Sequence, residues 1–167
     1  MKKIMGRVAW VFEDNFDVDF IIGIENIRVG EKDKILDVLM KHYEEDFKEK
    51  VIQGDILIGG KNFGYGHPHP QAMLGMRELG IKTVIAESFS FAFYRSELAS
   101  GMRLFECPGI SKNVERWDEI TVELGQDIPL LINKTKDVSI QLTQVPEIAM
   151  NIMESGGVIE FLKNDQI

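Results

Sequence analysis

The residues of this sequence that could do chemistry gather in one short stretch, 62–73, which reads NFGYGHPHPQAM. His67 and His69 are two of the three histidines in the chain, and an imidazole can serve as an acid, a base or a cation near neutral pH. Gly64 and Gly66 permit positive φ angles and let a ligand approach the backbone closely. The stretch is neither a phosphate-binding P-loop nor a dinucleotide fingerprint, because it lacks Gly-Lys-Ser/Thr and a third glycine. A turn that only reverses the chain is the simpler interpretation, but the two histidines favour a binding or catalytic site.

Three carboxylates form a second cluster earlier in the chain, at Asp14, Asp17 and Asp19. Side chains of this kind after a strand commonly make turns and loop hydrogen bonds, and a place in the site is the alternative. Asp17 is the best candidate to orient one of the loop histidines.

A metal site is a competing interpretation of the two loop histidines. His67 and His69 lie two residues apart, so in an extended chain they could share a face and bind zinc. His42 is the only further imidazole, and its place in the helical pattern of 33–48 indicates a solvent-facing side chain. The single cysteine, Cys107, cannot form an internal disulfide or hold a zinc ion or iron–sulfur cluster alone. We predict that it is a buried structural thiol.

The elements that must position the loop alternate along the chain up to Pro108. Short apolar runs predict strands, and apolar residues at helical spacing predict helices. The predicted strands are 6–14, 55–60, 82–88 and 103–107, and the predicted helices are 33–48, 70–79 and 89–100. This alternation indicates parallel crossover units, so the histidine loop lies at the carboxyl end of one strand and the N-terminus of the next helix. Open α/β sheets bind ligands at that edge, and a helix N-terminus favours an anion.

The pattern changes after Pro108. Short strands of the meander type are predicted at 120–124, 129–133 and 139–143. Pro146 and the pair Gly156-Gly157 bracket a last predicted helix. We expect a single α/β domain over residues 1–167, with parallel central strands and antiparallel additions.

Composition narrows the class of protein. The 167 residues are 44% hydrophobic and 28% charged, which is typical of a globular chain. A formal net charge of −8 argues against nucleic acid as a partner, because a phosphate backbone attracts basic faces. No apolar run reaches the roughly 18 residues of a membrane span, and the start MKKIMGRVAW lacks the apolar stretch of a signal peptide. We therefore expect a cytoplasmic protein that binds neither nucleic acid nor membranes.

Several blocks of the sequence resemble the small subunit of 3-isopropylmalate dehydratase, the swivelling domain of the aconitase superfamily. The opening GRVAWVFEDNFDVDFII is similar to the family's Gly-Arg-Val start and its Asp-Asn-x-Asp-Thr-Asp-x-Ile-Ile motif. The blocks GDILIGGKNFG (54–64), GIKTVIAESF (80–89) and ECP (106–108) follow in the family's order. The resemblance runs along essentially the whole chain.

The resemblance implies a three-layer, swivelling β/β/α domain that caps an active site carried mainly by a separate large subunit. That subunit would hold a [4Fe–4S] cluster, which agrees with the single cysteine of this chain. The implied reaction is dehydration and rehydration of a small hydroxy-dicarboxylate. The substrate would be 3-isopropylmalate, in leucine biosynthesis, or a related branched hydroxydiacid such as 2,3-dimethylmalate.

The histidine loop departs from the family's pattern. The family reads Ser-Ser-Arg-Glu after the second glycine, with a serine as the base and the arginine on a substrate carboxylate. Here those positions hold His67, Pro68, His69 and Pro70, so the serine mechanism cannot be carried over. We predict that His67 replaces the serine as base and that His69 replaces the arginine as carboxylate partner.

Four further residues belong to the implied substrate site or its surroundings. The resemblance implies that Gly64 and Gly66 still bring the backbone to a substrate carboxylate. We also predict that Asp17 lies in the substrate site. Arg28 lies in the segment that corresponds to the family's substrate-reading loop, so it either faces a substrate carboxylate or lies on the surface. Arg95 is expected to form a structural ion pair. A non-catalytic binding or regulatory module that keeps the fold, and a histidine-based metal-binding protein, stay open as alternatives.

Overall fold

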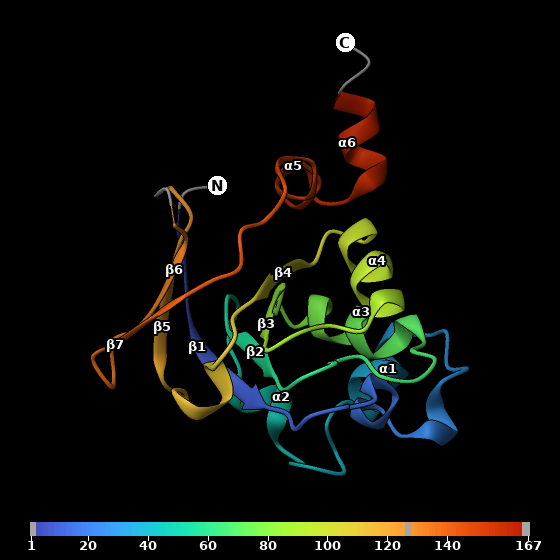
Figure 1. Ribbon diagram of the computed structural model, residues 1–167. Helices are drawn as coiled ribbons and strands as arrows, with labels where there is room; N and C mark the ends of the chain where they lie inside the picture. Colours follow the sequence, from blue (N-terminus) through green and yellow to red (C-terminus); the bar gives the residue numbers. More distant parts are fainter. Residues whose placement is uncertain (1–2, 126–127, 165–167) are drawn as a thin grey trace.

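The strands of the computed structural model, which describes residues 3–125 and 128–164, form one curled sheet (Figure 1). Its seven strands lie in the order β4-β3-β2-β1-β5-β6-β7. Their bounds are β1 Lys3–Val11, β2 Ile56–Gly59, β3 Thr83–Ala86, β4 Arg103–Glu106, β5 Glu119–Glu123, β6 Leu130–Asn133 and β7 Val138–Gln141. The pairs β1–β2, β2–β3 and β3–β4 are parallel, and the pairs β1–β5, β5–β6 and β6–β7 are antiparallel. The predicted α/β fold with a parallel centre and antiparallel additions is confirmed.

The helices between the parallel strands cover one face of the sheet. The α-helices are α1 Lys32–Val38, α2 Phe47–Lys50, α3 Pro70–Glu78, α4 Phe91–Ala99, α5 Glu147–Ser155 and α6 Val158–Asn164, and the 3-10 helices are η1 Val18–Ile21, η2 Ile24–Asn26 and η3 Ile110–Lys112. α3 joins β2 to β3, and α4 joins β3 to β4. Because such crossovers are right-handed and these strands follow one another in one direction across the sheet, both helices lie on the same side (Figure 1).

A cluster of phenylalanines supports the edge at which β1 and β2 end. All four residues of β2 and of β3 are buried, as expected for parallel strands covered on both faces. Beyond these strands, four rings that are at most 2% exposed pack against one another: Phe12, Phe16, Phe63 and Phe93. Burying each such side chain stabilises the fold by about 1.5–3 kcal/mol. These four rings form an apolar base, the phenylalanine floor, on which the loops that follow the strands lie.

The helical part differs from expectation in two places. The single helix predicted over 33–48 is wrong, because α1 ends at Val38 and only one further short helix, α2, forms. Met40 takes a positive φ of 60°, which lets its N–H donate to the carbonyl of Ile21 at 2.6 Å. This tertiary hydrogen bond overrides the helical spacing of the sequence. α6 was not predicted either, since the chain resumes a helix directly after Gly157.

Within the described ranges, no helix is long and apolar enough to cross a membrane. The expectation of one domain over residues 1–167 stays a prediction.

Candidate active site

The loops after β1, β2 and β3 meet at one edge of the sheet, as the crossover topology predicts. Asp14 accepts a hydrogen bond from the Lys61 N–H at 2.7 Å, and the Asn15 N–H donates to the Lys61 carbonyl at 2.7 Å. The Asn62 N–H donates to the Ser88 hydroxyl at 2.9 Å. Three loops that are distant in sequence are thus joined at the start of the histidine stretch.

The glycine frame of the loop is built against this edge. Gly64 has a φ of 78°, and a Cβ at this position would lie 2.2 Å from the Phe93 ring. The N–H groups of Gly64 and Tyr65 both donate to the Phe16 carbonyl, at 3.0 and 3.1 Å. In this conformation they do not point to a substrate carboxylate. The Gly66 N–H has no hydrogen-bond partner in the part of the chain that the structure describes, so it keeps the role proposed for the backbone of the loop.

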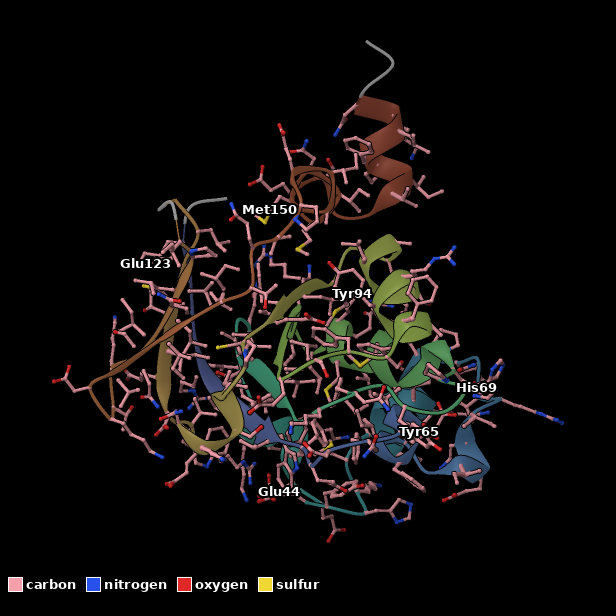
Figure 2. All side chains as sticks on the ribbon, viewed as in Figure 1. Glu44, Tyr65, His69, Tyr94, Glu123 and Met150 are labelled. Carbon is pink, nitrogen blue, oxygen red and sulfur yellow. The ribbon has the colours of Figure 1, made fainter. Side chains whose placement is uncertain are left out.

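His69 is held by a buried carboxylate. Its backbone N–H donates to Asp19 Oδ1 at 2.8 Å, and its Nδ1 lies 2.7 Å from Asp19 Oδ2. The Asp19 side chain is 9% exposed and the His69 side chain 37%. His69 is also the N-cap of α3, and Pro70 takes the first helical position, where its missing N–H costs no hydrogen bond. Figure 2 shows His69 at the edge of the molecule, where the chain leads into α3.

The anion expected at this helix N-terminus is therefore supplied by the chain itself. A carboxylate is stabilised by the free amides and the dipole at the start of a helix. Asp19, from η1, occupies that position for α3. A substrate carboxylate would have to bind beside Asp19 and not in its place.

The expectation that Asp17 orients a loop histidine is wrong. Asp17 caps η1, with its Oδ1 accepting the Asp19 N–H at 3.0 Å, and the hydrogen bonds to His69 come from Asp19. The 3-10 helix η1 explains why Asp19 and not Asp17 holds His69, because it turns residue 19 inward and leaves residue 17 at its N-cap. Asp17 still reaches the loop, since its Oδ2 would lie 2.8 Å from a Cβ built on Gly66. The sequence signal for Asp19 was its apolar surroundings, VDFII, which make it a buried carboxylate in need of a partner.

His67 is the less constrained of the two loop histidines. Its side chain is exposed, and its ring lies 5.8 Å from the His69 ring at an angle of 80°. Among the described residues the His67 ring has no hydrogen bond. Pro68 lies between the two histidines and fixes its own φ. The structure thus brings both predicted histidines to one place and orients only one of them.

The described residues do not fit an iron–sulfur cluster or a histidine metal site. Within residues 3–125 and 128–164, no three His, Cys, Asp or Glu side chains come together as metal ligands. Burial, helped by the nearby Glu87 carboxylate, raises the pKa of the Cys107 thiol to about 12, so the thiolate that a metal needs is disfavoured. Cys107 is fully buried, which confirms the prediction of a structural thiol. His42 is exposed, as predicted, and contacts Glu25 at 3.3 Å.

The two arginines named from the sequence differ in outcome. Arg28 is exposed on the segment after η2 and has no hydrogen bond or ion pair among the described residues, so its role in binding stays a prediction. Arg95 forms no ion pair within residues 3–125 and 128–164, contrary to expectation, and its guanidinium lies over the Phe91 ring, 5.2 Å from the ring centre. The buried ion pair of this region joins Arg77 on α3 to Glu97 on α4.

Comparison with known proteins shows to which family the chain belongs. Residues 19–105, from the carboxylate that holds His69 into β4, match the Aconitase C-terminal domain. The isopropylmalate/citramalate isomerase small subunit of Methanocaldococcus jannaschii is 39% identical over 98% of this chain and 96% of its own length. The chain belongs to the 3-isopropylmalate dehydratase small-subunit family.

Two further comparisons agree with this assignment. The 3-isopropylmalate dehydratase small subunit of Caldicellulosiruptor bescii is 34% identical over 94% of this chain and 93% of its own length. The crystal structure of 3-isopropylmalate dehydratase from Methanocaldococcus jannaschii superimposes with a TM-score of 0.84 at 27% identity, and covers 98% of this chain and 95% of that one. The similarity to the small-subunit family thus extends over nearly the whole chain and is not limited to a single segment.

Proposed function

We propose that this chain is the small subunit of a two-subunit hydro-lyase that dehydrates and rehydrates a small hydroxy-dicarboxylate. The observation that carries the proposal is the end-to-end match, 98% of this chain and 96% of the relative, to a curated small subunit. The substrate class follows from the names of such relatives, which act on isopropylmalate or citramalate. 3-Isopropylmalate, in leucine biosynthesis in the cytoplasm, is the first candidate, and a related branched hydroxydiacid such as 2,3-dimethylmalate is the second.

The chemistry of this reaction needs more than this chain offers. A base must take a carbon-bound proton, cations or amides must hold two carboxylates, and a Lewis acid must help hydroxide to leave. His67, His69, the Gly66 N–H and the exposed Arg28 can supply the first two functions, with Asp17 beside them. The described residues do not fit a [4Fe–4S] cluster, so we propose that the cluster is held by a large-subunit partner.

The open position of the loop supports the need for a partner. Tyr65, between the two glycines, is 54% exposed, and His67 is exposed as well. A cavity of about 320 Å³ exists elsewhere, between α4 and the segment after β7, and its lining contains neither histidine. Because small-substrate sites normally enclose their ligand, the histidine edge is half of a site that the large subunit would complete.

Co-purification of the full chain from its native cell, followed by iron analysis, tests the proposal. We expect the isolated chain to be colourless and inactive on hydroxydiacids, and the co-purified complex to contain iron and to form an alkene product measurable by ultraviolet absorbance. The double variant His67→Asn/His69→Asn should still bind the large subunit but lose turnover. Turnover by the isolated iron-free chain would contradict the subunit assignment, and absence of any iron-containing partner would favour a regulatory module.

A further inference from the structure

The contact between Asp19 and His69 fixes the imidazole more fully than a single hydrogen bond would. The two carboxylate oxygens accept separately, Oδ1 from the backbone N–H at 2.8 Å and Oδ2 from Nδ1 at 2.7 Å. Asp19 itself is fixed, because its N–H donates to Asp17 Oδ1 at 3.0 Å. Both neighbours of His69 are prolines, so neither has an N–H that could compete for the carboxylate.

This geometry selects one tautomer of His69. An ionised carboxylate accepts hydrogen bonds and cannot donate them, so Nδ1 must carry the proton that it shares with Asp19. In the neutral ring, Nε2 is then the acceptor. Asp19 engages Nδ1, 37% of the His69 side chain is exposed, and Nε2 has no hydrogen bond among the described residues, so Nε2 is free to accept a proton.

His67 lacks such an arrangement. Its ring is exposed and, among the residues that the structure describes, contacts only the His69 ring, 5.8 Å away. A general base works when a third group fixes its ring and tautomer, whereas a contact to a substrate carboxylate tolerates a side chain that orders on binding. The firmly held His69 therefore suits the role of base, and the less constrained His67 suits contact with a substrate carboxylate.

We infer that Asp19 and His69 form the proton-transfer pair of this site, with Nε2 of His69 as the base and Asp19 as its positioning residue. The inference rests on the function proposed above and exchanges the roles predicted from the sequence, which leaves His67 to contact a substrate carboxylate. In the step, Nε2 takes the carbon-bound proton, the electrons of that C–H bond form the second bond of the alkene, and the C–O bond to the neighbouring carbon breaks. Hydroxide leaves with the electrons of that bond, so the step is a net loss of water without oxidation or reduction.

The tautomer can be measured on the full chain alone by ¹⁵N NMR of its three imidazoles at about pH 8.5, where an unperturbed imidazole is neutral. We expect His69 to carry its proton on Nδ1. In Asp19→Asn the backbone N–H of His69 keeps the amide oxygen, so the amide NH₂ faces Nδ1 and the ring proton should move to Nε2. The control Glu25→Gln removes the exposed carboxylate beside His42 and should leave the His69 signals unchanged. A wild-type His69 protonated on Nε2, or on both nitrogens, would overturn the base assignment.

Kinetics of the two-subunit complex test the role itself. Asp19→Asn and His69→Asn should each lower kcat by about 10²–10⁴, the usual contribution of a general base, while KM changes less than about threefold. Their effects should not multiply in the double variant, because the two residues act as a unit. His67→Asn should mainly raise KM. An unchanged kcat in Asp19→Asn, or a rise in KM alone in His69→Asn, would overturn the inference.

Two checks keep the outcomes distinct. Far-ultraviolet circular dichroism and the melting temperature show whether Asp19→Asn folds, and if it does not, the wild-type tautomer and the kcat of His69→Asn decide. Failure of the proposed function would appear as a wild-type complex without turnover. Failure of this inference would appear as wild-type turnover that both substitutions leave intact.

Discussion

Gly64 packs tightly against Phe93, one of the four buried rings beneath the site loop. A Cβ built there would lie 2.2 Å from the Phe93 ring, at a φ of 78°. Its carbonyl accepts a hydrogen bond from the Ser90 hydroxyl at 2.5 Å. The position of the two histidines therefore depends on a residue without a side chain, three positions before the first of them.

Gly64→Ala should destabilise the chain by about 2–5 kcal/mol. The left-handed backbone contributes about 1–2 kcal/mol of this and the clash with Phe93 about 1–3 kcal/mol. Gly156→Ala is a matched control, because Gly156 has a φ of 86° and no atom of the described residues lies within 4 Å of its built Cβ; it should show the backbone contribution alone. Urea unfolding followed by circular dichroism measures both. Equal losses in the two variants would mean that the loop can move away from Phe93 without strain.

At the scale of elements, α3 and α4 are joined by a buried ion pair. Arg77 on α3 donates to Glu97 on α4, and the two side chains are 18% and 4% exposed. Burial raises the pKa of Glu97, although the Arg77 guanidinium works against this rise. α3 begins directly after its N-cap His69, so the pair also fixes the helix that positions the site.

Arg77→Met should cost about 3–5 kcal/mol at pH 7, because it leaves a buried carboxylate without its partner. Arg77→Met/Glu97→Leu should recover most of this loss. The penalty of Arg77→Met should shrink as the pH falls toward 4.5: a carboxyl whose folded pKa is raised binds its proton more readily when folded, so low pH favours the folded state. Lys32→Met, which breaks the exposed pair with Glu78 at 2.7 Å, is the control and should cost less than about 1 kcal/mol. Guanidinium unfolding between pH 4.5 and pH 7 gives the free energy of unfolding of the wild type and of the three variants. A destabilisation by Arg77→Met that does not change with pH would contradict the pairing.

The sequence was informative about elements wherever one strong local pattern decided the structure. Short apolar runs such as ILIG found the strands, and Gly80 and Gly101, both at positive φ, marked the ends of α3 and α4. The helix over 33–48 failed because a backbone hydrogen bond from Met40 to Ile21 is a tertiary contact that spacing does not record. The site shows the same limit. Both histidines were found. Asp17 was chosen over Asp19 because the two aspartates lie only two positions apart, and the sequence does not record that the 3-10 turn directs their side chains differently.

At the scale of the whole molecule, β1 holds the two halves of the sheet together, and Arg116 reinforces that junction. β1 pairs with β2 on one side and β5 on the other. The Arg116 guanidinium lies between the rings of Trp10 and Trp117, 4.4 and 4.3 Å from their centres. It donates to the Ala9 carbonyl at 2.9 Å and binds Glu44 through both of its terminal nitrogens. One side chain thus connects β1, the start of β5 and the turn before α2.

This junction should make the whole fold sensitive to acid. Hydrogen bonds from Arg116, and less strongly from Lys50, lower the pKa of Glu44 from 4.5 to about 2. A carboxyl whose folded pKa is lowered stabilises the folded state fully above its unfolded pKa, and this contribution is lost as the pH falls through the folded pKa. Glu44→Gln should therefore cost about 1–2 kcal/mol at pH 7, as expected for hydrogen bonds to a charged group, and progressively less between about pH 4.5 and pH 2. Glu45→Gln removes the same charge from the neighbouring exposed residue, which has no ion pair among the described residues, and should leave stability unchanged throughout. The urea midpoints of the wild type and the two variants across this pH range test the prediction. If the midpoints of wild type and Glu44→Gln differ by the same amount at every pH, Arg116 holds the junction through the two tryptophans and the Ala9 carbonyl alone.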